Sequence, residues 1–414
     1  MMLRYGERHL ECEIPEGNII SVLEPKHVSG LRDEQRAVVR AIRNPIGSPS
    51  LKETVSEGSR VALLVSDITR PCPSYKILPP LLTELNGAGV GDEDISIFFA
   101  TGMHRGHTPE ERKKLVGEEV STRIECIDHN PYGNSTYIGT TKRGTKVSVN
   151  RAVLECDSII SVGTIDVHWF AGYGGGAKSV LPGVSACETI RQNHSLMRHP
   201  DSKAGKAEGN PVREDMEEGA RMANLNFIVN VVLNQQKEIV QVLAGHFIKA
   251  HRAGVVLNDR MYKSSIGKKA DVVIASVGGF PKDINLYQTQ KGLENAWRVV
   301  KTGGEIILLA ECRDGVGDAV FWEWLEEADG STGKIIERFE KEFAIGGHKA
   351  YAIARVAESV QITLVSKLTE SVVRKAFMKP AKSVAEALVK AFTTYGRDAT
   401  VILMPFAALT LPNE

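Results

Sequence analysis

Residues 66–71 (SDITRP) combine side chains that could hold an anion. Small hydroxyls and backbone N–H groups directly after a strand suit a phosphate. The guanidinium of Arg70 offers a two-pronged contact to a phosphate or a carboxylate. A capped turn in which Asp67 and Arg70 pair with each other explains the same residues. The segment alone therefore leaves a ligand site and an ordinary turn both open.

Residues 101–108 (TGMHRGHT) bring two histidines and an arginine into one short segment. Imidazole titrates near neutral pH and is the side chain most often used as a general acid or base. His104 and His107 could share a metal ion on a helix, but the two glycines indicate a loop. The segment therefore favours proton transfer, with idle surface histidines as the alternative.

Residues 166–179 (DVHWFAGYGGGAKS) form the richest cluster. The stretch from Gly172 to Ser179 nearly matches the P-loop pattern G-x-x-x-x-G-K-[ST], but Ala177 replaces its last glycine and Pro182 interrupts the helix that should follow. A P-loop phosphotransferase is thus a minor alternative. The glycines still allow a ligand to approach the backbone closely. A lysine here, Lys178, can clamp a phosphate or, if its pKa is lowered, act as a nucleophile.

Residues 187–197 (CETIRQNHSLM) have the pattern of a helix that carries His194. A single histidine on a helix is more often a packed or surface residue than a metal ligand. His194 also lacks the partner of the zinc-hydrolase motif H-E-x-x-H. Taken alone, the segment makes metal binding the lesser interpretation.

Residues 280–291 (FPKDINLYQTQK) lead into a helix whose N-terminus favours anions. Three side chains there could face a carboxylate: Tyr287, Gln288 and Lys291. Ordinary helix capping is the alternative. The polar loop at residues 346–349 (GGHK) could line the same ligand cleft, which we expect between the two domains.

Strand and helix patterns alternate around these clusters. Short apolar runs predict buried strands at residues 61–65, 95–100, 158–162, 271–277, 305–310 and 359–365. Helical spacing predicts helices at residues 77–85, 290–301, 334–343 and 383–392, and a further one that begins at Pro109 after the N-cap Thr108. This alternation is typical of doubly wound parallel sheets, in which ligands bind where strands end.

We therefore predict two α/β domains with mainly parallel sheets and an active-site cleft between them. Residues 1–268 form a cofactor-binding domain and residues 269–399 a C-terminal domain. The apolar tail at residues 400–414 is expected to return to the first domain.

Composition excludes several classes of protein. The 414-residue chain is 42% hydrophobic and 25% charged, as globular domains are. The charges of its 51 basic and 51 acidic residues cancel, so the net charge does not indicate binding to nucleic acid or to a membrane surface. Six scattered cysteines, no visible signal peptide and no apolar run near the length of about 20 that spans a bilayer favour a cytoplasmic protein.

Taken together, the motifs resemble the nickel-dependent lactate racemase family over most of the chain, from DITRP through NLYQTQK. The resemblance implies an isomerase that carries nickel in a nickel pincer nucleotide, pyridinium-3-thioamide-5-thiocarboxylic acid mononucleotide. It implies that His104 and His168 are the acid/base pair and that His194 is the protein ligand to nickel. It also implies that Lys178 holds the cofactor, covalently or not, and that partner enzymes build it.

The same resemblance assigns the remaining site positions. Those for the cofactor are Asp67, Thr69, Arg70, Gly174, Gly175 and Gly176, and those for the substrate are Arg70, Tyr287, Gln288 and Lys291. The implied reaction inverts C2 of a 2-hydroxy acid, lactate or a related compound, by reversible hydride transfer through a planar 2-keto acid. A non-catalytic protein that binds the nickel cofactor remains the alternative from a different class.

Overall fold

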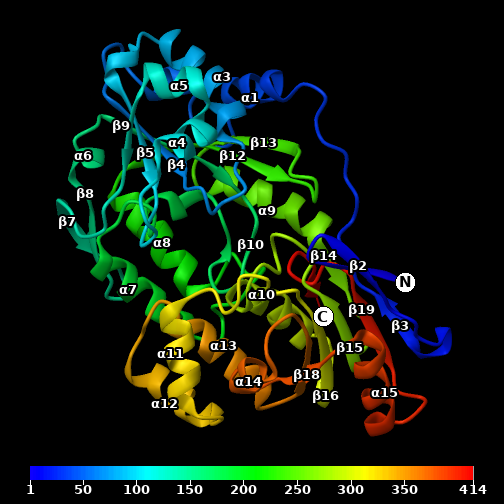
Figure 1. Cartoon of the computed structure of the whole chain (residues 1–414). Helices are drawn as coiled ribbons and strands as arrows, with labels where there is room; N and C mark the ends of the chain where they lie inside the picture. The colour runs from blue at the N-terminus through cyan, green and yellow to red at the C-terminus, as the bar shows by residue number, and fades with distance from the viewer. Residues whose placement is uncertain (414) are drawn as a thin grey trace. The chain divides into compact units, whose positions relative to one another are not determined.

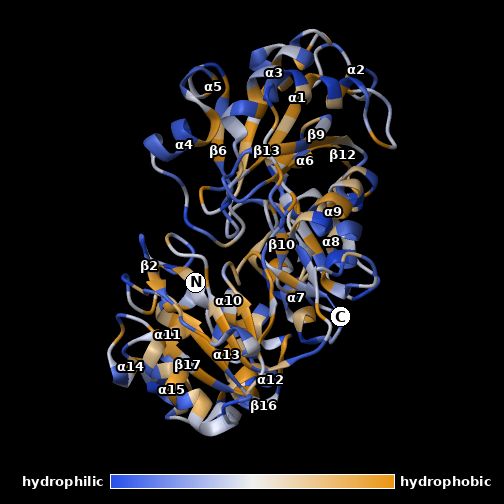
Figure 2. Ribbon diagram, turned by 90° about the vertical axis from the view of Figure 1, so that its right-hand side faces the viewer, coloured by the Kyte–Doolittle hydropathy of each residue, from blue (hydrophilic) through white to orange (hydrophobic). Residues whose placement is uncertain are grey.

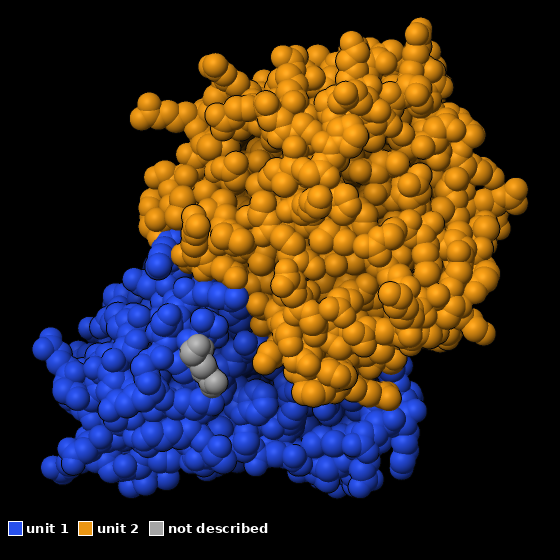
Figure 3. All heavy atoms as spheres, turned by 180° about the vertical axis from the view of Figure 1, so that it is seen from behind, with its two compact units in different colours: residues 1–26, 262–414 blue, residues 27–261 orange. Residues whose placement is uncertain are grey.

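The computed structural model describes residues 1–413. The chain divides into two compact units, one of residues 27–261 and one of residues 1–26 with residues 262–414 (Figure 3). Each unit contains a six-stranded, mainly parallel sheet with helices packed on it (Figure 1), so the predicted fold class is confirmed.

The sheet of residues 27–261 has the strand order β13-β12-β9-β4-β5-β6, with β13 antiparallel to β12 and the other pairs parallel. Three of its strands follow the apolar runs that predicted them. The strands are β4 (Val61–Ser66), β5 (Ile95–Ala100), β6 (Glu125–Asp128), β9 (Ser158–Thr164), β12 (Leu225–Leu233) and β13 (Ile239–Gly245).

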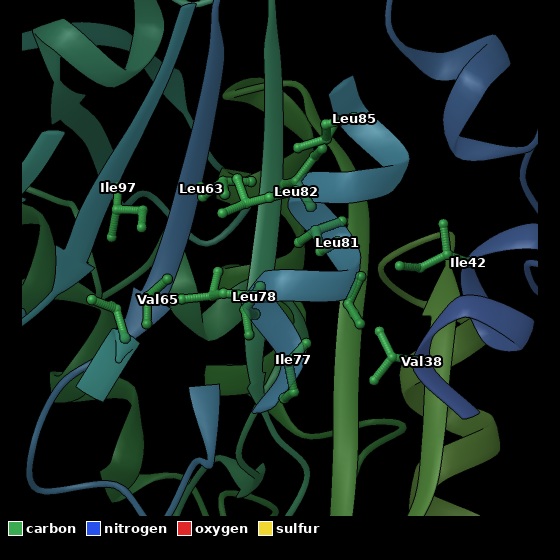
Figure 4. Packing of buried hydrophobic residues seen from close by; sticks show 14 of the residues in the cluster. Val38, Ile42, Leu63, Val65, Ile77, Leu78, Leu81, Leu82, Leu85 and Ile97 are labelled. Carbon is green, nitrogen blue, oxygen red and sulfur yellow. The ribbon is translucent and has the colours of Figure 1, made fainter. Parts of the chain in front are cut away.

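One face of this sheet is covered by α1 and α3, which form a continuous apolar cluster with β4 and β5 (Figure 4). Leu78 and Leu82 of α3 are fully buried, and each such side chain stabilises the fold by about 2 kcal/mol. The helices of this unit are α1 (Glu34–Arg43), α2 (Leu51–Thr54), α3 (Ser74–Asn86), α4 (Pro109–Val116), α5 (Glu118–Arg123), α6 (Arg151–Leu154), α7 (Cys187–Ser195), α8 (Pro211–Met222) and α9 (Lys249–Tyr262).

Shorter elements complete this unit. The hairpin of β7 (Ser135–Thr140) and β8 (Lys146–Asn150) and the two-residue pair β10 (Val167–His168) and β11 (Gly172–Tyr173) are antiparallel. Single 3-10 turns lie at Asp92–Asp94, Gly176–Ser179 and Leu196–Arg198.

The sheet of the other unit has the order β18-β17-β16-β15-β19-β3, and all of its pairs are parallel. The strands are β3 (Ile19–Val22), β15 (Ala270–Ser276), β16 (Val300–Leu309), β17 (Gln361–Val365), β18 (Lys379–Ala381) and β19 (Val401–Met404). The helices are α10 (Leu286–Trp297), α11 (Ala319–Ala328), α12 (Thr332–Lys341), α13 (Gly347–Ala357), α14 (Glu370–Lys375) and α15 (Val384–Tyr395). Short pairs join β1 (Met2–Tyr5) to β2 (Arg8–Glu11) and β14 (Lys263–Ser265) to β20 (Leu411–Asn413), and a 3-10 turn lies at Glu16–Asn18.

The structure divides the chain differently from the predicted boundaries. Residues 1–26 belong with the C-terminal unit because β3 pairs with β19. The tail after residue 399 belongs to the C-terminal unit rather than to the unit of residues 27–261, because β19 lies between β15 and β3 and β20 pairs with β14. Both corrections arise from strand pairs between distant parts of the chain.

Hydrophobic residues concentrate in the strands of both sheets (Figure 2). Among residues 1–413, none of the helices combines the length and the apolar character needed to cross a bilayer.

Candidate active site

The three polar clusters of residues 27–261 lie at one edge of the sheet. They follow β4, β5 and β9, which are parallel neighbours in the order β9-β4-β5. Parallel neighbours end at the same edge, so the loops after them converge there. The sheet therefore brings the SDITRP, TGMHRGHT and DVHWFAG segments together.

Asp67 and His104 form a pair at this edge. The Nδ1 atom of His104 lies 3.1 Å from Oδ2 of Asp67, whose other oxygen accepts the backbone N–H of Thr69 at 2.7 Å. Burial favours the neutral acid, but the hydrogen bond with His104 and the charge of Arg70 outweigh it and lower the pKa of Asp67 to about 2. Asp67 is thus ionised at neutral pH and holds Nδ1–H of His104, which leaves Nε2 for a substrate; the side chain of His104 is 45% exposed.

The second histidine of this loop has a structural role that the sequence did not reveal. His107 is buried, and its Nδ1 lies 2.5 Å from Oδ1 of Asp128 at the end of β6. Its Nε2 accepts the backbone N–H of Ile68 at 3.1 Å, which fixes the segment next to Asp67. Because His104 and His107 pair with different carboxylates, they do not form a shared metal site.

His168 lies in β10, opposite Gly172 of β11. Its Nδ1 accepts the backbone N–H of Ala171 at 3.3 Å, so the neutral ring carries its proton on Nε2.

Lys178 lies in the 3-10 turn Gly176–Ser179, and the next α-helix, α7, begins only at Cys187. The helix that a P-loop requires is therefore absent from this place in the described chain. Burial and the charges of Arg70 and Arg213 hold the pKa of Lys178 well below its usual range. Both effects favour the neutral amine, which is the form that a nucleophile or a covalent anchor uses.

The glycines before Lys178 allow the backbone to pack closely against neighbouring side chains. Gly175 has φ +69°, and a Cβ atom there would lie 2.6 Å from Oδ1 of Asn230. The same oxygen accepts the N–H of Gly176 at 2.7 Å. Side chains are thus excluded here, because protein atoms already occupy the place that a Cβ atom would take.

His194 lies on α7, as predicted, and its Nδ1 is 3.2 Å from Oδ1 of the buried Asn193. The amide of Asn193 is itself oriented because its Nδ2 donates to Asp215 at 2.8 Å. This arrangement holds Nδ1–H of His194, as the outer hydrogen bonds of metal-binding histidines do.

One aromatic ring joins these predicted residues. The centroid of the buried Phe170 lies 4.6 Å from the ring of His168 and 5.0 Å from the ring of His194, and 5.9 Å from Nζ of Lys178. The structure therefore gathers the predicted acid/base, metal-binding and cofactor-holding residues around Phe170. Apart from its place in the DVHWFAG motif, no sequence signal indicates this role of Phe170.

The remaining predicted residues lie in the other unit, at the start of α10. Asn285 caps this helix by accepting the N–H of Gln288 at 2.9 Å. Tyr287 and Lys291, four residues apart, project from one face. The Tyr287 ring contacts Phe321 and His348, with centroids 5.8 and 6.3 Å away.

The predicted polar loop at residues 346–349 is instead the buried start of α13. Lys349 is 3% exposed, because its Nζ donates to Oε1 of Gln290 at 2.6 Å and lies 5.4 Å from the centroid of the Tyr287 ring. Burial, together with the charge of Lys349, lowers the pKa of His348 to about 3. The segment thus packs beside Tyr287.

Comparisons with known proteins agree with these observations. Residues 5–205 match the family model of the lactate racemase N-terminal domain, and residues 266–408 match that of the lactate racemase C-terminal domain. The chain is 34% identical over 420 residues to lactate racemase of Thermoanaerobacterium thermosaccharolyticum, which covers 99% of this chain and 98% of that protein. It is 33% identical over 415 residues to lactate racemase of Lactiplantibacillus plantarum, which covers 97% of each.

Solved structures extend the likeness to three dimensions. The lactate racemase apoprotein of T. thermosaccharolyticum superposes with a TM-score of 0.93 over all of both chains, at 34% identity. A protein from Thermotoga maritima superposes with a TM-score of 0.68 at 18% identity and covers 94% of this chain and all of its own, which shows the shared fold alone.

Proposed function

Because the chain belongs to the lactate racemase family and is an enzyme of the isomerase class, we propose that it inverts C2 of a 2-hydroxy acid, with lactate as the first candidate substrate. The observation that carries this proposal is the arrangement of His168, His194 and Lys178 around Phe170. Because the three side chains lie around one ring, their arrangement supports the proposal that they serve one bound cofactor as acid/base, metal ligand and amine anchor.

The residues fit a nickel pincer nucleotide. Burial and the neighbouring cations Arg70 and Arg213 disfavour the charged form of the Lys178 amine, which supports its assignment as the residue that holds the cofactor. His194 offers one oriented imidazole, which together with soft sulfur donors suits square-planar Ni(II). When bound, this group supplies a two-electron acceptor for the C2 hydride.

Two histidines account for inversion because the two enantiomers present their hydroxyls in opposite directions. His104, held by the ionised Asp67, accepts the hydroxyl proton of one enantiomer at Nε2. We assign the other enantiomer to His168, whose Nε2–H is a donor and so takes the general-acid part toward the hydroxyl oxygen. Each contributes about 10²–10⁴-fold to the rate as a general acid or base.

The substrate carboxylate requires fixed cationic and polar donors. We assign it to Arg70, whose guanidinium can hold a carboxylate by two hydrogen bonds and so keep C2 in reactive geometry. That Tyr287, Gln288 and Lys291 at the start of α10 also bind it stays a prediction.

Mass spectrometry and a chiral assay test the proposal together. The chain is produced alongside the enzymes that build the cofactor, and its native and denatured spectra are compared. We expect nickel plus a nucleotide mass in the native spectrum, and a nucleotide mass that survives denaturation only if Lys178 is its covalent anchor. A chiral chromatographic screen of 2-hydroxy acids then identifies the substrate.

The alternatives give different results. A protein that only stores the cofactor binds the added mass but shows no turnover with any 2-hydroxy acid. A phosphotransferase shows neither, and instead binds ATP in a way that Lys178→Ala abolishes. Retention of deuterium at C2 after racemisation supports hydride transfer, whereas washout into solvent supports an enolate route.

A further inference from the structure

The backbone that links His168 to Lys178 is held by side chains from α8 and α9. Asn210 donates to the carbonyl of Phe170 at 2.8 Å, and Nε2 of His251 donates to the carbonyl of Gly174 at 2.8 Å. Arg213 donates to three more carbonyls, those of Ala171 at 3.3 Å, of Gly175 at 3.2 Å and of Tyr173. Five of the six carbonyls in residues 170–175 are thereby fixed from outside this loop.

Arg213 is an unusual residue for such a place. Its side chain is fully buried, and among residues 1–413 no carboxylate lies within ion-pair distance of its guanidinium. Burying a cation costs free energy, which backbone carbonyl dipoles and the nearby charges of Glu217 and Asp166 offset here. A well-packed apolar residue would be easier to bury, so this position is explained by geometry rather than by stability.

His251 is held in the tautomer that this role requires. Nη1 of Arg252 lies 3.0 Å from its Nδ1, which must therefore accept, so the ring proton is on Nε2 and points to Gly174. Arg252 in turn pairs with Glu217 of α8 at 2.8 Å. The two helices are thus tied together behind the loop.

The guanidinium of Arg213 contacts carbonyls near both ends of residues 170–175, those of Ala171 and Gly175. The residue after Phe170, Ala171, donates its N–H to His168, and Gly175 directly precedes the turn that carries Lys178. A single planar guanidinium in contact with both carbonyls sets the separation of the two ends. Its charge also contributes to the lowered pKa of Lys178.

We propose that Arg213, supported by His251, is a positioning residue that fixes His168 and Lys178 relative to each other through the backbone of residues 170–175. The roles of His168 and Lys178 rest on the proposed function, whereas the hold on the loop does not. Neither Arg213 nor His251 is expected to touch the substrate.

The test uses Arg213→Lys, which keeps the charge but loses the fork, and His251→Gln, which keeps a donor. Arg221→Met, at an exposed position on the same helix α8, is the matched control. Hydrogen exchange of residues 170–178 is measured on the full chain without cofactor. We expect about tenfold faster exchange in Arg213→Lys, a smaller change in His251→Gln and none in the control.

The same variants are then produced with the cofactor-building enzymes. We expect a lower nucleotide mass per chain in Arg213→Lys, and in the loaded fraction a kcat about tenfold lower with KM nearly unchanged. Unchanged exchange at residues 170–178 in Arg213→Lys would overturn the proposal. If the unmodified chain takes up no cofactor, the proposed function fails, yet the exchange result still decides whether Arg213 holds the loop.

Discussion

Replacing Asp67 by Asn tests the acid/base assignment most directly. The amide is nearly isosteric with the carboxylate, so the hydrogen bond from the Thr69 N–H can persist. The atom that faces Nδ1 of His104 becomes either a neutral acceptor or an N–H donor. In the second case His104 must carry its proton on Nε2, which is the wrong tautomer for a base.

The magnitude follows from the pKa of Asp67. It is about 2 in the folded chain, against an ordinary value of 3.8. One pKa unit corresponds to about 1.4 kcal/mol, so the interactions of the ionised carboxylate amount to about 2 kcal/mol. Because the side chain is only 5% exposed, solvent screening reduces this little. If most of this free energy stabilises the protonated imidazole of His104, kcat in Asp67→Asn falls roughly 30-fold.

The same shift predicts a pH dependence of stability. A carboxyl with a depressed folded pKa contributes its full stability above its unfolded pKa, near 4, and loses it as the pH falls through its folded pKa, about 2. The difference in unfolding free energy between the unmodified chain and Asp67→Asn should therefore be constant from pH 5 to 7 and shrink between about pH 4 and pH 2.

The assay is racemisation of the identified substrate in both directions, followed by chiral chromatography across a range of pH. Asp157→Asn, at a half-exposed carboxylate remote from His104 in sequence, is the control for loss of a charge. Activity of Asp67→Asn within about threefold of the unmodified chain, with the same pH profile, would refute the role of Asp67 as the partner of His104.

Three further variants test separate contacts. Lys178→Ala should remove any nucleotide mass that survives denaturation, and such a mass still present in the variant would place the anchor elsewhere. Asn193→Ala should lower the nickel-to-protein ratio measured by elemental analysis roughly tenfold or more while the nucleotide mass remains, because His194 loses its outer hydrogen bond. Gln192→Ala on the same helix is the control, and an unchanged nickel content in Asn193→Ala would show that Asn193 has no role in metal binding. Thr108→Ala removes the N-cap of α4, whose hydroxyl accepts the N–H of Glu111 at 3.2 Å; denaturant unfolding should show a loss of about 1 kcal/mol with activity retained, and a loss of activity would contradict a purely structural role.

Local signals accounted for most of the secondary structure. The strand at residues 95–100 was predicted to the residue, because its apolar run is bounded by polar turns on both sides. Helix α10 begins at Leu286 rather than at 290 because Asn285 supplies an N-cap, a signal that the apolar spacing alone did not include. The division into units was missed because β3 pairs with β19 across some 380 residues, which no local pattern encodes.

In the candidate site, too, sequence patterns reveal residue types but not the contacts between distant parts of the chain. Histidines and lysine in dense polar motifs could be identified because their chemistry is visible in the residue type. Phe170, Arg213 and His251 could not, because each acts only through partners that the fold brings to it. An arginine within an amphipathic helix such as α8 is typical of a solvated face, and its burial becomes visible only in three dimensions.

The pairing of β3 with β19 has a consequence for the order of events during synthesis. Residues 27–261 form a continuous stretch that can fold as soon as it leaves the ribosome, since domains generally fold as units and from the N-terminal side. The strand β3 is made earlier, yet its partner β19 is among the last parts of the chain to emerge. The strand β3 must therefore wait for its partner while the unit of residues 27–261 is completed after it. Nascent chains arrested shortly before residue 401 should leave β3 accessible to protease, and chains released beyond residue 404 should protect it.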